Sequence, residues 1–249
     1  MSERGRVKVE EGRKRVRAMV AGQVVVDSTR PLLVWEKPYY PTYYFRADDV
    51  RMDLLSDTGE TQESPSRGTA RVYSIVSDEF EVEGAVRGYD ESPIEELAGT
   101  FTLDWKAMDH WFEEDEEVFV HPRDPYTRID ALRSSRHVRI DVDGVTVAES
   151  TGPIIVFETG LPPRYYLPKT DARMDLLFPS DSTTECPYKG TAEYWNLEVD
   201  GTTYEDIVWS YPFPAHESAP IAGLVCFYDE KVDVTVDGAD QERPKTHFA

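Results

Sequence analysis

A thiol and an amine stand close together in the second half of this 249-residue sequence. Cys186 and Lys189 are three residues apart in the run Cys-Pro-Tyr-Lys-Gly. A nearby positive charge lowers the pKa of a cysteine, and a lysine shielded from water forms Schiff bases with carbonyl compounds. We therefore take Cys186 and Lys189 as candidate catalytic residues. The alternative is a small buried cysteine beside a solvated strand lysine.

Aromatic residues in the same half are the candidate ligand-binding groups. Rings with polar tips suit a cleft that holds a flat or cationic small molecule. The candidates are Tyr166, Tyr188, Tyr194, Trp195, Trp209, Tyr211, Phe227 and Tyr228. Neighbours on a strand point to opposite faces, so Tyr165 and Tyr166 cannot both line one cleft, whereas Trp209 and Tyr211 share a face. The alternative for each ring is an aromatic core between sheets.

These residues belong to the second of two copies of one sequence unit. With an offset of 122 residues, Val16–Tyr73 aligns without a gap to Val138–Trp195, and 25 of the 58 aligned positions are identical. The period is too long for a solenoid repeat and indicates a duplicated domain. We expect two domains, at residues 14–133 and 134–243.

The differences between the copies bear on the chemistry. At the constant offset, Ser64 stands where the second copy has Cys186, and Arg67 stands where it has Lys189. A hydroxyl and a guanidinium lack the soft nucleophile and the amine, so covalent chemistry is expected only in the second copy. Arg67 is therefore a candidate for noncovalent ligand binding in the first copy.

Each copy is predicted to consist mostly of strands. Asp143-Gly144 is the preferred two-residue hairpin turn between alternating segments, and Ala21-Gly22 takes its place in the first copy. The helical candidates are two short segments, 93–98 and 109–116, and Glu113–Glu117 is expected to be a solvated acidic turn. The predicted fold class is all-β, with antiparallel sheets and few short helices.

The alignment of the two copies weakens beyond Tyr73. We allow about eighteen extra residues in the first copy and pair Trp105 with Trp209, because both lie in strand-like surroundings. Later strands of the second copy are expected from their β-branched and aromatic residues, at 191–199, 204–210, 222–228 and 231–236.

The second copy resembles a known family in three stretches. These are 184–195, which includes Cys-Pro-Tyr-Lys-Gly, 209–214 and 223–233. The first copy is similar to the same family at 65–70 and 121–126. Together the copies resemble the domain-of-unknown-function 427 (DUF427) family, as a tandem pair that covers nearly the whole chain. The resemblance implies a β-tent-like domain, in which two antiparallel sheets meet at an angle and leave a cleft at the open end.

The resemblance implies no settled activity. A nucleotidyltransferase label is sometimes attached to the family, and such activity is one alternative function. Proteins of the wider tent-like group often carry zinc on paired Cys-x-x-Cys motifs, but this chain has only two cysteines, Cys186 and Cys226, and no such pair. No two of the five histidines have metal-ligand spacing. We expect no metal and no cofactor.

Charge and apolar patterning limit the expected partners. The chain has 27 basic and 48 acidic residues and a formal net charge of −21, which disfavours nucleic acid and anionic membranes as partners. No apolar run is long enough to span a membrane, and we expect neither a membrane span nor a secretory signal. Two cysteines suit a reducing compartment, so we expect a cytoplasmic location.

Two functions from different classes fit these observations. The first is binding or conversion of a small-molecule ligand, a metabolite, in an aromatic-lined cleft of the second copy, with Lys189 and Tyr211 holding a polar or acidic group. Glu36 and Glu158, which follow apolar runs, are either buried bases or carboxylates in water. The second function is a noncatalytic module whose acidic surface recognises a cationic ligand or a protein partner. Loss of binding on replacement of Lys189 would favour the first.

Overall fold

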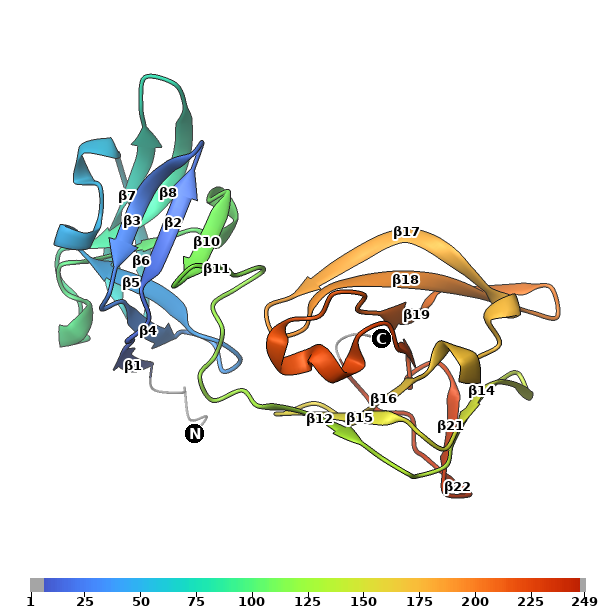
Figure 1. Ribbon diagram of the computed structural model, residues 1–249. Coiled ribbons are helices and arrows are strands. Elements are labelled where there is room, and N and C mark those ends of the chain that lie inside the picture. The colour runs from blue at the N-terminus through green and yellow to red at the C-terminus, as the bar shows by residue number, and fades with distance from the viewer. Residues whose placement is uncertain (1–6, 247–249) are drawn as a thin grey trace. The chain divides into compact units, whose positions relative to one another are not determined.

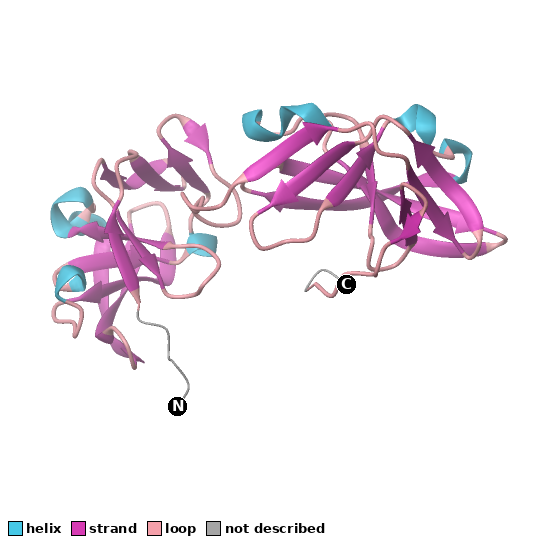
Figure 2. Ribbon diagram, turned by 90° about the horizontal axis from the view of Figure 1, so that it is seen from below, coloured by secondary structure: helices cyan, strands magenta, loops and turns pink. Residues whose placement is uncertain are grey.

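The computed structural model describes residues 7–246, which form two compact units that divide between Asp124 and Pro125 (Figure 1). Each unit contains a seven-stranded and a four-stranded antiparallel sheet. The helices in the described part of the chain are all short 3-10 turns (Figure 2). The sheets of the two units have the same strand order, which confirms the all-β fold and the tandem duplication.

The first unit contains β1 to β11. Its large sheet has, in spatial order, β1 (Lys8–Glu11), β4 (Leu32–Trp35), β5 (Thr42–Arg46), β9 (Thr100–Leu103), β8 (Glu81–Tyr89), β7 (Gly68–Val76) and β6 (Leu55–Ser64). Its small sheet has β11 (Glu116–Glu117), β10 (His110–Glu113), β2 (Val16–Val20) and β3 (Gln23–Ser28). The 3-10 turns are η1 (Ala47–Asp49), η2 (Met52–Leu54), η3 (Glu95–Leu97) and η4 (Trp105–Ala107).

The second unit contains β12 to β22. Its large sheet has β12 (Ile129–Arg133), β15 (Ile154–Glu158), β16 (Arg164–Leu167), β20 (Val225–Phe227), β19 (Thr202–Ser210), β18 (Gly190–Val199) and β17 (Leu177–Cys186). Its small sheet has β14 (Val145–Ser150), β13 (Val138–Val142), β21 (Asp233–Val236) and β22 (Ala239–Asp240). The 3-10 turns are η5 (Lys169–Asp171), η6 (Met174–Leu176) and η7 (His216–Ile221).

The two units differ at their edges from the predicted domains, 14–133 and 134–243. β1 lies before residue 14, yet it completes the first large sheet by pairing with β4. β12 lies before residue 134, yet it pairs with β15 and so belongs to the second large sheet. Both are edge strands of four or five residues, too short to stand out in the hydrophobic pattern.

Backbone conformation explains the hairpin that opens each small sheet. Asp143 and Gly144 have φ values of 50° and 79°, and Ala21 and Gly22 have 47° and 74°. Positive φ at both central residues is the signature of a type I′ turn, whose twist matches that of the flanking strands. The predicted turn is therefore confirmed in both units.

The segment 109–116 requires a correction. It was predicted as a short helix, but it forms β10 and the start of β11. The predicted solvated acidic turn at Glu113–Glu117 is confirmed at its centre, where Glu114 and Asp115 form an exposed turn, and is wrong for Glu113. Trp111 and Glu113 point inward on β10, and Glu113 is only 4% exposed. A carboxylate is buried in this way only when it accepts hydrogen bonds. The amino-acid composition of the segment does not show which donors supply them. The other predicted helix, at 93–98, contains η3.

Each large sheet packs on both of its faces. One face meets the small sheet across an apolar core, here called the inter-sheet core, and the other face covers a smaller apolar core, here called the outer core. Tyr43 and Tyr165 lie in the inter-sheet cores, whereas Tyr44 and Tyr166 lie in the outer cores. The predicted opposite orientation of neighbouring tyrosines is confirmed.

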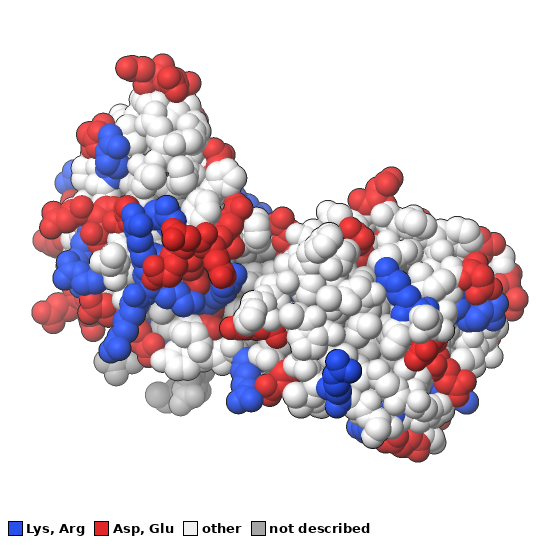
Figure 3. Space-filling view, viewed as in Figure 1, with Lys and Arg blue, Asp and Glu red and all other residues white. Residues whose placement is uncertain are grey.

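Charged side chains are spread over the surface of both units. In the face shown in Figure 3, acidic side chains occur on each unit with basic side chains among them. Between residues 7 and 246, no helix has the length and apolar character needed to cross a membrane.

Gly190 fixes the turn between β17 and β18, a long hairpin that arches over the second unit in Figure 1. Its φ is +95°, and a Cβ atom added to it would lie 3.2 Å from the carbonyl oxygen of Phe213. A side chain at this position would be strained by the backbone and would press on a neighbouring segment.

We predict that Gly190→Ala lowers the free energy of unfolding by about 1–3 kcal/mol, because both effects oppose the added methyl group. Gly160→Ala is the matched control, since Gly160 has a φ of +78° but no atom within 4 Å of an added Cβ. The control should lose only the conformational part, about 1 kcal/mol. Urea unfolding followed by circular dichroism measures both losses, and equal losses would contradict the packing role of Gly190.

Candidate functional site

The predicted catalytic pair lies at the turn of the β17–β18 hairpin. Cys186 ends β17 as a half-buried free thiol. The Lys189 ammonium donates a short hydrogen bond to the carboxylate of Glu158, and the two side chains are 14% and 12% exposed. The side chain of Lys189 is therefore held by the Glu158 carboxylate.

Four of the predicted ligand-binding rings pack together in the outer core of the second unit. These are Tyr166, Tyr194, Trp209 and Tyr211, each less than one-tenth exposed. The indole Nε1 of Trp209 donates to the hydroxyl of Tyr166 at 3.1 Å, and the two rings meet edge to face. Burial raises the pKa of Tyr166 and of Tyr211, so both phenols stay neutral. Here the rings fill space against one another.

The remaining predicted rings lie elsewhere in the second unit. Phe227 is fully buried in the inter-sheet core, and Trp195 packs against that core with the Lys169 ammonium 4.8 Å from its ring centroid. Tyr228 touches both cores, and Tyr188 is buried at the hairpin turn. The structure thus brings the outer-core rings together but places Phe227 and Trp195 on the opposite face of the sheet.

The first unit holds a related polar cluster, which includes the predicted ligand-binding residue Arg67. The Tyr44 hydroxyl donates to the Glu36 carboxylate at 2.7 Å, and Arg67 Nη1 lies 2.7 Å from that hydroxyl and 2.8 Å from Glu36. Arg67 Nε also donates to Ser64 at 3.1 Å. Glu36, Tyr44 and Arg67 stand at the 122-residue offset from Glu158, Tyr166 and Lys189. Each repeat therefore places a carboxylate, a tyrosine and a cation in its outer core.

Strand pairing shows which residue of the first unit corresponds to Trp209. Val72 pairs with Arg87, and Tyr194 pairs with Trp209, so both members are offset by 122 residues. Trp209 therefore corresponds to Arg87. The predicted pairing of Trp105 with Trp209, and the eighteen extra residues that it required, are wrong. Up to β8 and β19 the strands kept their register while their side chains changed, so similarity was lost there without an insertion. Beyond them, Thr102 corresponds to Cys226, so the second repeat is two residues longer between these strands.

A two-lobed cleft opens in the first unit beside this cluster. The polar lobe, a cavity of about 220 Å³, is lined by residues that include Arg67, Arg87 and Tyr89. The aromatic lobe, a cavity of about 360 Å³, is lined by rings and by two lysines. The lobes share four wall residues, Glu36, Thr42, Leu103 and Asp104. We treat them as one first-repeat cleft.

Two stacked ring pairs form the walls of the aromatic lobe. Trp105 and Trp111 are parallel within 4°, with centroids 4.6 Å apart, and Tyr40 lies on His121 at 3.9 Å. Burial lowers the pKa of His121, so its imidazole is neutral at pH 7. These two ring pairs are therefore flat, uncharged and polarizable, and they suit a planar ligand.

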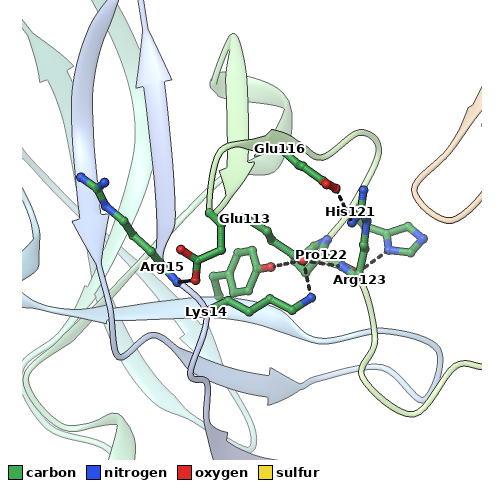
Figure 4. Close-up of polar contacts among 9 residues, drawn as sticks. Lys14, Arg15, Glu113, Glu116, His121, Pro122 and Arg123 are labelled. Carbon is green, nitrogen blue, oxygen red and sulfur yellow. Dashed lines mark hydrogen bonds and ion pairs between the residues drawn. The ribbon is translucent and has the colours of Figure 1, made fainter. Parts of the chain in front are cut away.

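The buried carboxylate of Glu113 fixes the segment that carries His121 (Figure 4). It accepts hydrogen bonds from the Tyr43 hydroxyl at 2.6 Å, from Lys14 Nζ at 2.6 Å and from the Arg123 backbone N–H at 3.3 Å. Glu113 thereby joins β10, β5, the segment before β2 and the chain after His121. One wall of the cleft is held by charge-assisted hydrogen bonds as well as by apolar packing.

A family profile described as a domain of unknown function (DUF427) matches residues 8–114 and 130–238. Each match covers one repeat, and the matches begin at β1 and β12. The chain belongs to the DUF427 family. No curated protein matches it.

The two DUF427 repeats differ where the first has its cleft. Arg87 and Asp104 line the polar lobe. Their counterparts in the second repeat are Trp209 and Tyr228, because β8 pairs with β9 as β19 pairs with β20. The centroids of these two rings are 4.6 Å apart. Larger apolar side chains therefore pack against each other at the place that is open and polar in the first repeat.

Sequence reasoning missed the cleft of the first DUF427 repeat. Trp105 and Trp111 were assigned to a mismatched strand and to a helix, so their stacking was not foreseen. The usable signal was the pair of tryptophans six residues apart in an otherwise polar segment. In residues 7–246, no group of three acidic, histidine or cysteine side chains is placed to hold a metal ion.

We predict that Lys189→Met lowers the free energy of unfolding by about 1–3 kcal/mol, because the mostly buried carboxylate of Glu158 loses its cation. Urea unfolding of the full chain at pH 7 measures this loss. The double variant Lys189→Met with Glu158→Gln should recover most of it, since no unpaired charge remains. If the single variant is as stable as the wild type, the ion pair does not hold the turn.

Proposed function

We propose that this protein binds a small planar organic anion noncovalently, in the first-repeat cleft. The observation that carries the proposal is the aromatic lobe opening directly beside the polar lobe, which Arg87 lines. A ligand ring lies against the stacked walls, and its carboxylate or phosphate reaches the guanidinium.

Arg87 is the group that binds the anionic part of the ligand. Its Nε donates to the Gln62 side chain at 2.8 Å and its Nη1 to the Gly84 carbonyl at 2.6 Å. Within residues 7–246, no carboxylate forms an ion pair with Arg87, whereas Arg67 is paired with Glu36. A guanidinium held in place by neutral acceptors keeps its full charge for a ligand.

The charge of the cleft supports the same ligand class. Its walls carry four basic side chains, Lys37, Arg67, Arg87 and Lys106, and three acidic ones, Glu36, Glu63 and Asp104. The chain as a whole has a net charge of −21, which repels anions at a distance. A local excess of positive charge compensates for that repulsion at the binding site.

The proposal places the ligand in the first repeat, whereas the sequence favoured the second. Two features support the change. The outer-core rings of the second repeat contact one another, and Lys189 is engaged by Glu158. The first repeat has Ser64 in place of the thiol at Cys186, so binding there is noncovalent.

We predict that Arg87→Gln weakens the binding of planar carboxylates about tenfold or more, because a charge-assisted hydrogen bond is lost. Saturation-transfer NMR and calorimetric titration compare indole-3-acetate and benzoate with their neutral counterparts, indole and benzyl alcohol. The neutral probes should bind wild type and variant equally. Trp105→Ala should weaken the charged and neutral ring probes alike.

The charge-matched control is Arg13→Gln, which removes an exposed arginine of the same unit that does not line the cleft. It should bind like the wild type once circular dichroism has shown that each variant is folded. If none of the four probes binds, or if Arg13→Gln weakens binding as much as Arg87→Gln, the proposed site is wrong.

A further inference from the structure

Asp229 of the second repeat is a buried carboxylate with an unused oxygen. It is the second residue after β20, and its side chain is 8% exposed. Its Oδ2 is 3.5 Å from Arg164 Nη1, and its Oδ1 has no hydrogen-bond partner among residues 7–246. A buried acceptor without a donor costs folding free energy, so the position calls for an explanation other than packing.

The neighbouring arginine is committed to another carboxylate. Arg164 donates from Nη1 to Glu230 Oε2 at 2.8 Å and from Nη2 to Glu230 Oε1 at 2.5 Å, and the Thr246 hydroxyl adds a third bond. Although burial opposes ionisation of Glu230, these donors lower its pKa to about 2. Burial, with the nearby charge of Glu230, raises the pKa of Asp229 to about 7 despite Arg164.

Asp229 lines a cavity of about 130 Å³, which has the volume of about four water molecules. The other lining residues are Pro162, Pro163, Tyr165, Val234, Gln241, Glu242 and Pro244. Three prolines, a valine and a tyrosine ring make most of this wall apolar. The chain after β22 supplies the remaining wall and is tied down by the bond from Thr246 to Glu230.

The cavity corresponds in position to the aromatic lobe of the first repeat. Tyr165 stands 122 residues after Tyr43, and both line their cavities. Asp229 directly follows Tyr228, as Trp105 directly follows Asp104, so the carboxylate takes the place of the indole. The two repeats are hollow at the same point of the fold, with a neutral ring in one and an acid in the other.

We propose that the cavity at Asp229 binds a primary alkylammonium ion. The ammonium donates a hydrogen bond to the Asp229 carboxylate, and the alkyl chain packs on the prolines and on the Tyr165 ring. With Asp229 ionised, Asp229, Glu230 and Glu242 carry three negative charges near the cavity, against the positive charge of Arg164. Arg136, which acts on the Tyr165 ring, is balanced by its own ion pair with Asp237. This excess of negative charge favours the binding of a cation.

The pH dependence of binding follows from the groups that face Asp229. Arg164 and Glu230 keep their charges between pH 5.5 and 8. Burial raises the pKa of Tyr165 and of the Cys226 thiol, so both stay neutral in that range. Glu242, on the chain after β22, carries a carboxylate at the rim. Asp229 is therefore the group whose change of charge alters binding between pH 5.5 and 8. The alkylammonium stays protonated over that range.

The test titrates the full chain with n-butylammonium chloride and follows binding by NMR chemical shifts, with sodium chloride at equal ionic strength as the reference. We expect saturable binding at pH 8 that weakens about tenfold or more at pH 5.5. Asp229→Asn should bind at pH 8 as weakly as the wild type does at pH 5.5. This variant should fold, because the wild-type carboxyl is already neutral below its pKa of about 7.

The matched control is Glu198→Gln, which removes one exposed carboxylate from β18 and should leave butylammonium affinity unchanged. Arg87→Gln should also leave it unchanged, so the outcome is independent of the ligand proposed for the first repeat. The proposal is overturned if the wild type shows no saturable binding at pH 8. It is equally overturned if Asp229→Asn binds as tightly as the wild type.

Discussion

The packing of each large sheet on both faces is the constraint on which the rest of the structure depends. Because side chains alternate along a strand, each strand must supply residues to the inter-sheet core and to the outer core. On β20, Val225 and Phe227 enter the inter-sheet core and Cys226 enters the outer core. Every polar group that reaches the outer core then needs a local partner, since the face is shielded from water. The carboxylate, tyrosine and cation of each repeat meet that need.

A comparison of the repeats shows how one substitution requires another. Arg67 has a planar fork and contacts the Tyr44 hydroxyl as well as the Glu36 carboxylate. Lys189 offers a point charge without that fork, and it bonds to Glu158. The hydroxyl of the second tyrosine then receives its hydrogen bond from Trp209. Thus the tryptophan that replaces Arg87 both satisfies the tyrosine and fills the space of the polar lobe.

The sequence was sufficient for the features that follow from local rules. Two-residue turns such as Asp143-Gly144 need positive φ, and alternation alone separates Tyr165 from Tyr166, so both could be predicted. The cleft of the first repeat could not be predicted in this way. Its existence depends on the size of side chains that are far apart in the sequence and are brought together by neighbouring strands. Arg87 leaves the space open and Trp209 fills it, although the backbone register is the same. The burial of Glu113 depends likewise on donors from three distant segments.

The two proposed sites use the same place in a duplicated fold for two different recognition chemistries. The inter-sheet edge beside Tyr43 and Tyr165 is hollow in both repeats. The two proposed sites differ at the second residue after β9 or β20, which is Trp105 in the first repeat and Asp229 in the second. In the first repeat, an indole there stacks on a second indole. The guanidinium of Arg87 lines the adjoining polar lobe and has no carboxylate partner among the described residues. In the second repeat, a carboxylate there competes with its neighbour for one arginine, and the neighbour prevails because its geometry is bidentate. A single guanidinium cannot form a full ion pair with each of two adjacent carboxylates. The carboxylate without a full partner is either protonated or paired with a cation from outside the chain.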